Sequence, residues 1–152
     1  MSSNGYPVKP RFYGIAKCDA GFLATMIGWN GVTWQQAHVA AITYRVYDAD
    51  TGAPTGSGTL VVGDTIFDTP QKDATWPWTD HGYNLRAILP ASCFPQAGLY
   101  LIEMRFAAQG RISAEVWEYY AAQLLSDPTL CVGAAPVAVA IPALVGAGVY
   151  SA

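Results

Sequence analysis

Two runs of alternating residues constrain the fold of this chain more than any other feature. Residues 42–48 read ITYRVYD, and residues 99–106 read LYLIEMRF. Successive side chains of a strand point to opposite faces, so each run predicts a strand that buries one face. In the first run, Ile42, Tyr44, Val46 and Asp48 share a side. In the second run, Tyr100, Ile102, Met104 and Phe106 form the cleaner apolar stripe.

Shorter segments predict further strands, and turn residues separate them. We expect strands at residues 21–29, 59–62, 83–89 and 111–119, with another candidate at 64–67. Asn30-Gly31 and Gln109-Gly110 are typical of tight turns. Residues 35–41 predict one helical turn, and residues 120–125 a short terminal helix before Pro128. The Pro-, Gly- and Ser-rich residues 53–58 predict a loop.

About seven short strands without a long helix or a repeat indicate an all-β fold. The spacing favours an immunoglobulin-like antiparallel β-sandwich with extended N- and C-terminal arms, and a barrel is the alternative. We therefore expect an N-terminal arm over residues 1–20, the sandwich over 21–126 and an apolar C-terminal arm over 127–152.

The composition suggests that part of the surface faces other protein. Hydrophobic residues make up 52% of the chain and charged residues 12%, against about 25% charged residues in an ordinary globular chain. A formal net charge of −3 argues against a nucleic-acid binder, which would need a cationic surface. The first ten residues lack the apolar core of a signal peptide, so none is expected.

The three cysteines, Cys18, Cys93 and Cys131, lie far apart in the sequence. Their odd number and wide spacing fit neither a disulfide framework nor a zinc site. We expect three buried, reduced side chains that pack as small hydrophobic groups, which suits assembly in a cytosol.

Two motifs have a binding interpretation and a structural one. The carboxylates Asp48 and Asp50 before Gly52 begin like a calcium loop, but no further carboxylate follows until Asp64; a hairpin turn held by side-chain hydrogen bonds is the better interpretation. An aromatic shelf for a glycan, or a contact with another subunit, could form from Trp76, Trp78, His81 and Tyr83.

Catalytic and metal-binding patterns are missing from the sequence, so we expect no enzyme, no cofactor and no metal. The two histidines, His38 and His81, have no second ligand at metal-binding spacing. Gly56-Ser57-Gly58 lacks the strand-to-helix setting of a nucleophilic serine. Glu115 and Glu118 are three residues apart, which places them on opposite faces of a strand rather than in a carboxylate pair.

The terminal segments predict contacts with other subunits. Residues 129–152 carry no charge, but Pro136 and Pro142 interrupt any membrane helix. Alternation at 137–141 predicts a short strand that adds to a sheet edge, either the chain's own or a neighbour's. We expect no membrane partner, and we assign the arm contacts to Phe12, Tyr13, Val137, Val139, Ile141, Leu144 and Val145.

Four groups of residues together resemble a known family. They are 42–48 with Asp50-Thr51-Gly52; 66–71 with 73–76; 82–86 with 89–92 and 94–95; and 97–100. Over residues 21–120 they resemble small Ig-like structural proteins of tailed-phage and prophage-like gene clusters. This resemblance implies a virion protein, assembled in the host cytoplasm, whose partners are major capsid or neighbouring virion proteins and further copies of itself.

Two functional hypotheses of different classes follow. The first is a capsid decoration or cement protein that binds between major capsid subunits, with a head–tail connector, neck or tail protein as its variant. The second is an Ig-like glycan-binding module built on the two tryptophans.

Overall fold

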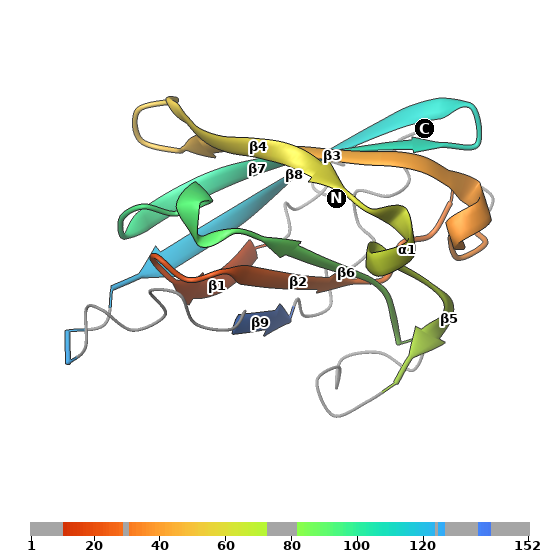
Figure 1. Cartoon of the computed structure of the whole chain (residues 1–152), viewed down its shortest axis with the longest axis horizontal. Coiled ribbons are helices and arrows are strands. Elements are labelled where there is room, and N and C mark those ends of the chain that lie inside the picture. Colours follow the sequence, from red (N-terminus) through yellow and green to blue (C-terminus); the bar gives the residue numbers. More distant parts are fainter. Residues whose placement is uncertain (1–10, 29–30, 73–81, 124, 127–136, 141–152) are drawn as a thin grey trace, which may run out of the picture.

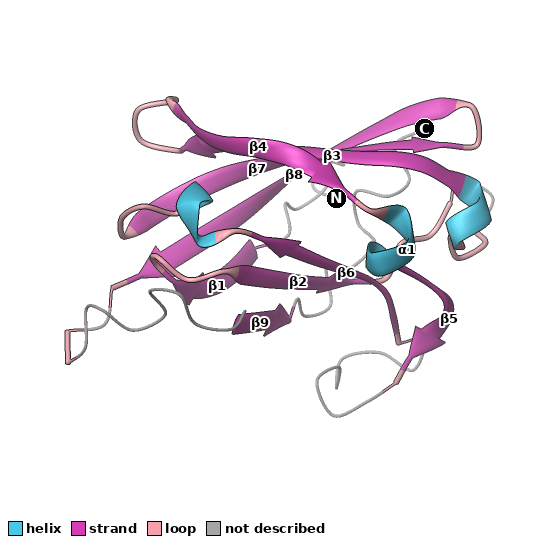
Figure 2. Ribbon diagram, viewed as in Figure 1, coloured by secondary structure: helices cyan, strands magenta, loops and turns pink. Residues whose placement is uncertain are grey.

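The computed structural model describes residues 11–28, 31–72, 82–123, 125–126 and 137–140, and its strands form two sheets packed face to face (Figure 1). In these described residues, helical structure is confined to short segments between strands: η1 (Gln36–His38), α1 (Val62–Thr65) and η2 (Ala91–Cys93) (Figure 2). The predicted all-β sandwich is confirmed.

The five-stranded sheet has the order β1-β8-β7-β3-β4. These strands are β1 (Arg11–Ile15), β8 (Arg111–Ala122), β7 (Gly98–Ala108), β3 (Val39–Asp48) and β4 (Pro54–Leu60). All neighbours pair antiparallel except β1, which runs parallel to β8. Between β7 and β8 only Gln109 and Gly110 turn the chain, and both have the positive φ that two-residue hairpin turns require.

The four-stranded sheet has the order β5-β6-β2-β9. It contains β5 (Ile66–Gln71), β6 (Tyr83–Leu89), β2 (Ala20–Ala24) and β9 (Val137–Ala140). The last strand, β9, pairs parallel with β2, while the other pairs are antiparallel. β9, from the last part of the chain, therefore forms the edge of this sheet beside β2, which comes from the first part.

The strand order is that of an immunoglobulin-like domain. In chain order, β2, β3, β4, β6, β7 and β8 occupy the places of strands B, C, C′, E, F and G, with β5 as D. Tyr100, near the start of β7, donates its hydroxyl to the Gln96 carbonyl at 2.6 Å and accepts the Gln96 N–H at 3.2 Å. This bond back to an upstream backbone is the tyrosine corner of such domains.

Aromatic rings fill the centre of the sandwich. The rings of Phe12 and Phe22 lie 4.6 Å apart between their centroids, and Phe12 lies 5.2 Å from Trp117. Phe94 lies 4.6 Å from Tyr119. All five side chains are at most 1% exposed. Phe12 comes from β1 and packs against Phe22 of β2 and Trp117 of β8, so the first strand is part of the core.

Both alternating runs bury the faces that the sequence predicts. Ile42, Tyr44 and Val46 face the core from β3. The stripe on β7 is fully buried: Tyr100, Ile102, Met104 and Phe106 are at most 1% exposed. The strand predicted at 83–89 is β6, and the turn at Gln109-Gly110 forms as expected.

The loop predicted over residues 53–58 is wrong, because β4 begins at Pro54 and pairs along β3. Its glycines explain the strand. A methyl group on Gly58 would meet the Tyr44 hydroxyl at 2.5 Å, and one on Gly56 would meet the Cys93 sulfur at 2.5 Å. Glycine therefore lets two core side chains lie directly against this strand.

Three other local predictions need correction. The helix expected over 120–125 does not form, because β8 continues to Ala122, where Tyr120 pairs with both Leu99 and Tyr13. The strand candidate at 64–67 is divided between α1 and β5. The strand expected at 21–29 ends at Ala24, since Met26 N–H and C=O bond instead to the Asn84 side chain at 2.6 and 3.0 Å.

The expected boundaries of the terminal arms were too generous. Residues 11–15 form β1 within the five-stranded sheet, so the sandwich begins before residue 21. The strand predicted from the alternation after residue 136 does form, as β9, and it extends the chain's own sheet beside β2. The side chains of Val137 and Val139 lie outside the description, as do residues 141–152.

Candidate functional site

The outer face of the five-stranded sheet carries a group of exposed apolar side chains on β1 and β8. Tyr13 is 60% exposed, Ile112 64%, Val116 38% and Tyr120 47%. On β8 these residues alternate with inward-facing Ser113, Glu115, Trp117 and Tyr119. We call the four exposed residues the β1–β8 patch.

The two tyrosines lie side by side at one end of the patch. Tyr13 and Tyr120 are paired in the parallel register of β1 and β8, and their ring centroids lie 6.5 Å apart. Beside them, Arg11 contacts the carboxylate of Glu118 at 2.8 Å through Nη2 and donates to it from Nε at 2.9 Å. An exposed ion pair of this kind contributes little stability. Glu118 lies on the same face between Val116 and Tyr120, so the ion pair separates the two tyrosines from Val116 and Ile112.

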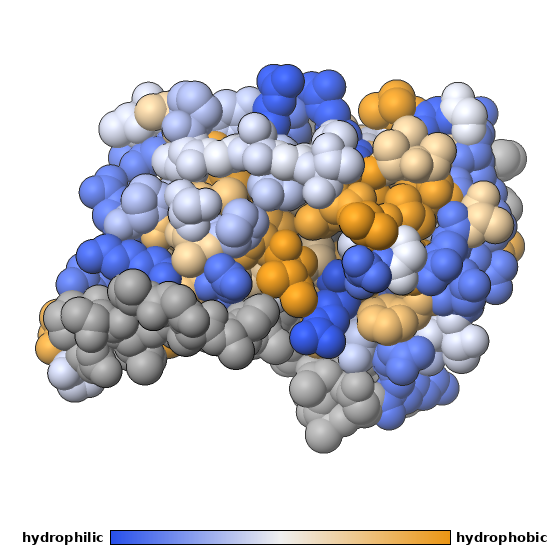
Figure 3. Space-filling model, viewed as in Figure 1, coloured by the Kyte–Doolittle hydropathy of each residue, from blue (hydrophilic) through white to orange (hydrophobic). Residues whose placement is uncertain are grey.

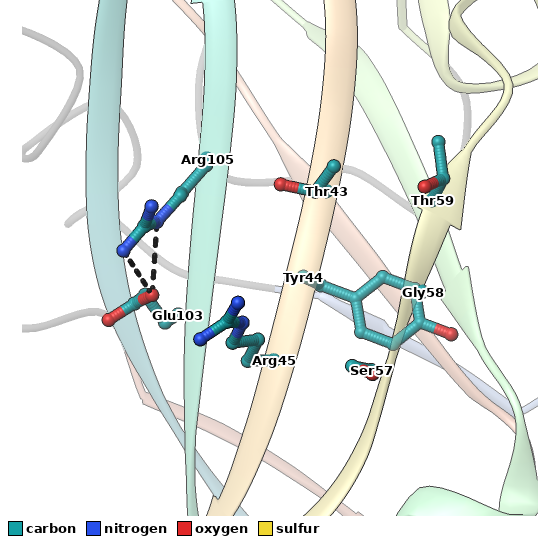
Figure 4. A pocket seen from close by; sticks show the side chains of 8 residues that line it. All are labelled: Thr43, Tyr44, Arg45, Ser57, Gly58, Thr59, Glu103 and Arg105. Atoms are coloured by element: carbon teal, nitrogen blue, oxygen red, sulfur yellow. Dashed lines mark hydrogen bonds and ion pairs between the residues drawn. The ribbon is translucent and has the colours of Figure 1, made fainter.

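The other half of the same face is a polar hollow over β3, β4 and β7 (Figure 4). Its volume is about 290 Å³, and it is lined by Thr43, Tyr44, Arg45, Ser57, Gly58, Thr59, Glu103 and Arg105. Arg105 forms an ion pair with Glu103 at 3.1 Å on the same strand. Arg45 lies opposite both Glu103 and Ser57 in the strand register. Two guanidinium groups and one carboxylate leave the hollow with a formal charge of +1.

The turn between β3 and β4 is held by its own side chains. Asp48 Oδ1 accepts hydrogen bonds from the backbone N–H groups of Asp50 at 2.8 Å and Thr51 at 3.2 Å. The Gly52 N–H donates to the Asp48 carbonyl at 2.8 Å. This confirms the hairpin-turn interpretation of these residues. Among the described residues, no group of three histidine, cysteine or acidic side chains could hold a metal ion.

A buried carboxyl group is the main electrostatic feature inside the sandwich. Glu115 is 6% exposed, and its Oε1 accepts a hydrogen bond from Trp117 Nε1 at 3.1 Å. Its Oε2 has no hydrogen-bond partner. Burial raises the pKa of Glu115 from 4.5 to about 6 despite the Trp117 bond. The alternation of β8 indicated that Glu115 and Glu118 face opposite sides, but not that Glu115 would be the inward one.

The expectation of three reduced cysteines is wrong for Cys18, which is disulfide-bonded. Cys93 is a free, buried thiol beneath β4, and burial raises its pKa to about 11. Cys131 lies outside the described residues. The wide sequence spacing of the cysteines gave no sign of a disulfide, because the fold decides which cysteines come within bonding distance.

Of the residues predicted to contact other subunits, the structure leaves Tyr13 exposed and buries Phe12. Tyr13 is exposed and belongs to the β1–β8 patch. The assignment of Phe12 to an interface is wrong, because Phe12 is 0% exposed and packs on Phe22 and Trp117. Alternation along β1 puts neighbouring residues on opposite faces. Ile141, Leu144 and Val145 lie outside the described residues.

The predicted aromatic shelf loses one member. Tyr83 is 6% exposed and packs its ring edge-on against Phe67, with 5.8 Å between centroids. Tyr83 packs with Leu23 and Phe67 in a cluster separate from the main core, so little of its ring is left exposed to a ligand. Trp76, Trp78 and His81 lie outside the described residues.

Sequence reasoning overlooked the polar hollow. Its outward residues, Thr43, Arg45, Ser57 and Thr59, come from a predicted strand and a predicted loop with a short strand after it. Only the register between β3 and β4 brings them side by side.

No helix among the described residues is long and apolar enough to cross a membrane.

Comparisons with known proteins give no family. No family model matches the sequence, and no curated protein matches it. Among solved structures, a chain named Tim-1 aligns with a TM-score of 0.34 and 9% identity, over 77% of this chain and 95% of that chain. A similarity of this size carries no argument, and the Ig-like fold rests on the strand order and the tyrosine corner.

Proposed function

We propose that this chain is an Ig-like structural subunit of a phage-type virion. Its role is that of a capsid decoration protein that binds between major capsid subunits, and a connector, neck or tail position is the alternative. The β1–β8 patch is the observation that carries the proposal. Tyrosine is enriched in protein interfaces, where its ring supplies contact area at a small cost in conformational entropy.

Further support comes from the composition and from the family resemblance of the sequence. Few charged residues and an apolar, uncharged terminal segment suit a protein that is covered on several sides. The exposed side chains of the patch lie on two adjacent strands, so one flat partner surface could cover them together.

The disulfide changes one part of the proposal. Disulfides persist in oxidising surroundings and are reduced in most cytosols. A subunit of a released particle meets oxidising conditions, so the bond at Cys18 suits the particle after release better than the assembling particle.

Fractionation of the native source tests this role. We expect the chain to sediment with particle-sized material, at a fixed copy ratio to one abundant major protein. Many copies for each major subunit indicate decoration, and a ring-sized number indicates a connector. A chain found only in slowly sedimenting fractions would contradict the proposal.

A further inference from the structure

Among the described residues, β4 forms an open edge of the five-stranded sheet, and its composition carries no charge to protect that edge. It pairs with β3 on one side and ends the sheet order on the other. Proteins usually protect such an edge with charged residues, because its unpaired N–H and C=O groups attract other strands. Residues 54–60 read PTGSGTL and carry no charge, and the proline stands at the first position. β1, the opposite edge, carries Arg11.

The surface next to this edge is polar, and only short side chains project from it. The pale row of residues across the upper part of the molecule in Figure 3 follows β4, as expected for glycine, serine and threonine. Ser57 and Thr59 are exposed on its outer side, and their side chains are short. A second hollow of about 380 Å³, lined by Arg45, Tyr47, Pro54, Gly56 and Ser57, adjoins the first.

Arg45 stands between the two hollows and lines both. Its cross-strand neighbour on β7, Glu103, already pairs with Arg105, and the ion pairs of the described residues do not include Arg45. Figure 4 shows the Arg45 guanidinium group turned over β7 toward Glu103, with Ser57 on the other side of β3. The neighbour of Arg45 on the β4 side is only a serine, so a change of the Arg45 side-chain rotamer would carry the guanidinium group over β4 toward the open edge without a steric clash.

We propose that β4 and Arg45 together form a binding site for an extended, acidic segment of a partner protein. The partner's main chain pairs with the open edge of β4, and a carboxylate on its outer face binds Arg45. Strands in a sheet are about 4.8 Å apart, so the added strand lies about two spacings from β3. A long arginine side chain and a glutamate together span that distance, and the Ser57 hydroxyl can donate a second hydrogen bond.

This arrangement divides affinity and specificity between backbone and side chain. Main-chain hydrogen bonds along an added strand supply affinity without regard to sequence. A bidentate guanidinium–carboxylate contact supplies the preference for an acidic residue. A second copy of β4 fits less well, because its residues carry no carboxylate to place against Arg45. The inference does not rest on the virion role, and it concerns a different part of the face from the β1–β8 patch.

Two matched peptides test the site. Acetyl-Thr-Val-Glu-Val-Thr-amide and its twin with glutamine in the centre are titrated into the full ¹⁵N-labelled chain. We expect saturable shifts of the β4 amides and of the Arg45 side chain, with the glutamate peptide binding about tenfold more tightly, as for a charge-assisted hydrogen bond. Arg45→Gln should abolish the difference between the peptides.

Two further variants complete the design. Arg86→Gln removes an exposed arginine from β6 in the other sheet, and it should leave the preference for the glutamate peptide intact. Ser57→Glu places a competing carboxylate beside Arg45 and should weaken the glutamate peptide more than its glutamine twin, while an unchanged far-UV circular dichroism spectrum shows that the sheet is retained.

Three results would overturn the proposal. They are an absence of β4 shifts at millimolar peptide, equal affinities for the two peptides, and an equal loss of the preference in Arg45→Gln and Arg86→Gln. Concentration-dependent dimerisation that protects the β4 amides without peptide would also overturn it, because a second copy would then occupy the edge.

Discussion

The buried carboxyl of Glu115 should make the stability of this domain fall as the pH rises through the weakly acidic range. Its pKa is raised by burial from 4.5 to about 6, so the folded state holds the proton more tightly than the unfolded chain does. The stabilisation by this proton is therefore complete below pH 4.5 and is lost as the pH passes the folded-state value. A shift of about 1.5 pKa units corresponds to roughly 2 kcal/mol.

Glu115→Gln isolates this effect. Glutamine keeps an acceptor oxygen for the Trp117 Nε1–H group, which lies 3.1 Å from Glu115 Oε1, and it does not titrate. We expect the stability of the variant, relative to the natural chain, to increase by about 2 kcal/mol between pH 4 and pH 7. Urea denaturation at a series of pH values measures this difference, and the subtraction cancels the other titrating groups.

Glu118→Gln is the matched control on the same strand. Its carboxylate is exposed and contacts Arg11, so its removal should cost less than about 1 kcal/mol. A stability difference between Glu115→Gln and the natural chain that stays constant with pH would refute the reasoning, because it would show that burial does not favour the protonated carboxyl.

Three further predictions concern packing, buried polar contacts and the thiols. Asn84→Ala should lower the free energy of unfolding, measured by urea denaturation, by about 3 kcal/mol. The buried Asn84 side chain accepts a hydrogen bond from the Met26 N–H and donates to the carbonyls of Met26 and Trp34. A loss below about 1 kcal/mol would contradict this role. Gly58→Ala should lower the melting temperature, because the new methyl group is forced against the Tyr44 ring at a cost of about 1–3 kcal/mol. Gly63→Ala is the control, since its methyl group meets nothing within 4 Å and should not lower the melting temperature. Equal effects of the two variants would argue against the close approach of Tyr44 to Gly58. A thiol titration of the denatured, unreduced chain should find fewer thiols per chain than the three found after reduction, because Cys18 is disulfide-bonded while Cys93 is free. Three thiols without reduction would disprove the disulfide at Cys18.

The sequence predicted the parts of the fold in which hydrophobic alternation is strong. The buried faces of β3 and β7 follow directly from the spacing of residues such as Tyr44 and Met104, because the period of two leaves no other face for them. The Gln109-Gly110 turn is equally local, since its backbone conformation depends on two residues.

The sequence failed where distant partners decide the structure. Gly56 and Gly58 look like loop residues until Cys93 and Tyr44 occupy the space above them. The sequence around Tyr120 favours a helix, but pairing with Tyr13 and Leu99 places this residue in a strand. Tertiary contacts override local preference at such positions.

The candidate site was predictable only in part for the same reason. Tyr13 could be singled out as a contact residue from its place near the N-terminus, but Phe12 beside it is a core residue. The partners of Tyr13 in the patch lie on β8, about a hundred residues later in the chain. Such a surface becomes visible only once the parallel register of β1 and β8 is known.

The most direct test of the proposed role is the recovery of a Tyr13→Ser, Tyr120→Ser double variant in purified particles. Ile88→Ser is the matched control, because Ile88 is also exposed, at 36%, but lies on the other sheet. Replacing two ring contacts should cost several kcal/mol of binding, at about 1–2 kcal/mol for each side chain. The account predicts that the double variant folds but is lost from the particle fraction while Ile88→Ser remains. Equal recovery of both variants would contradict the claim that the β1–β8 patch binds a neighbouring subunit.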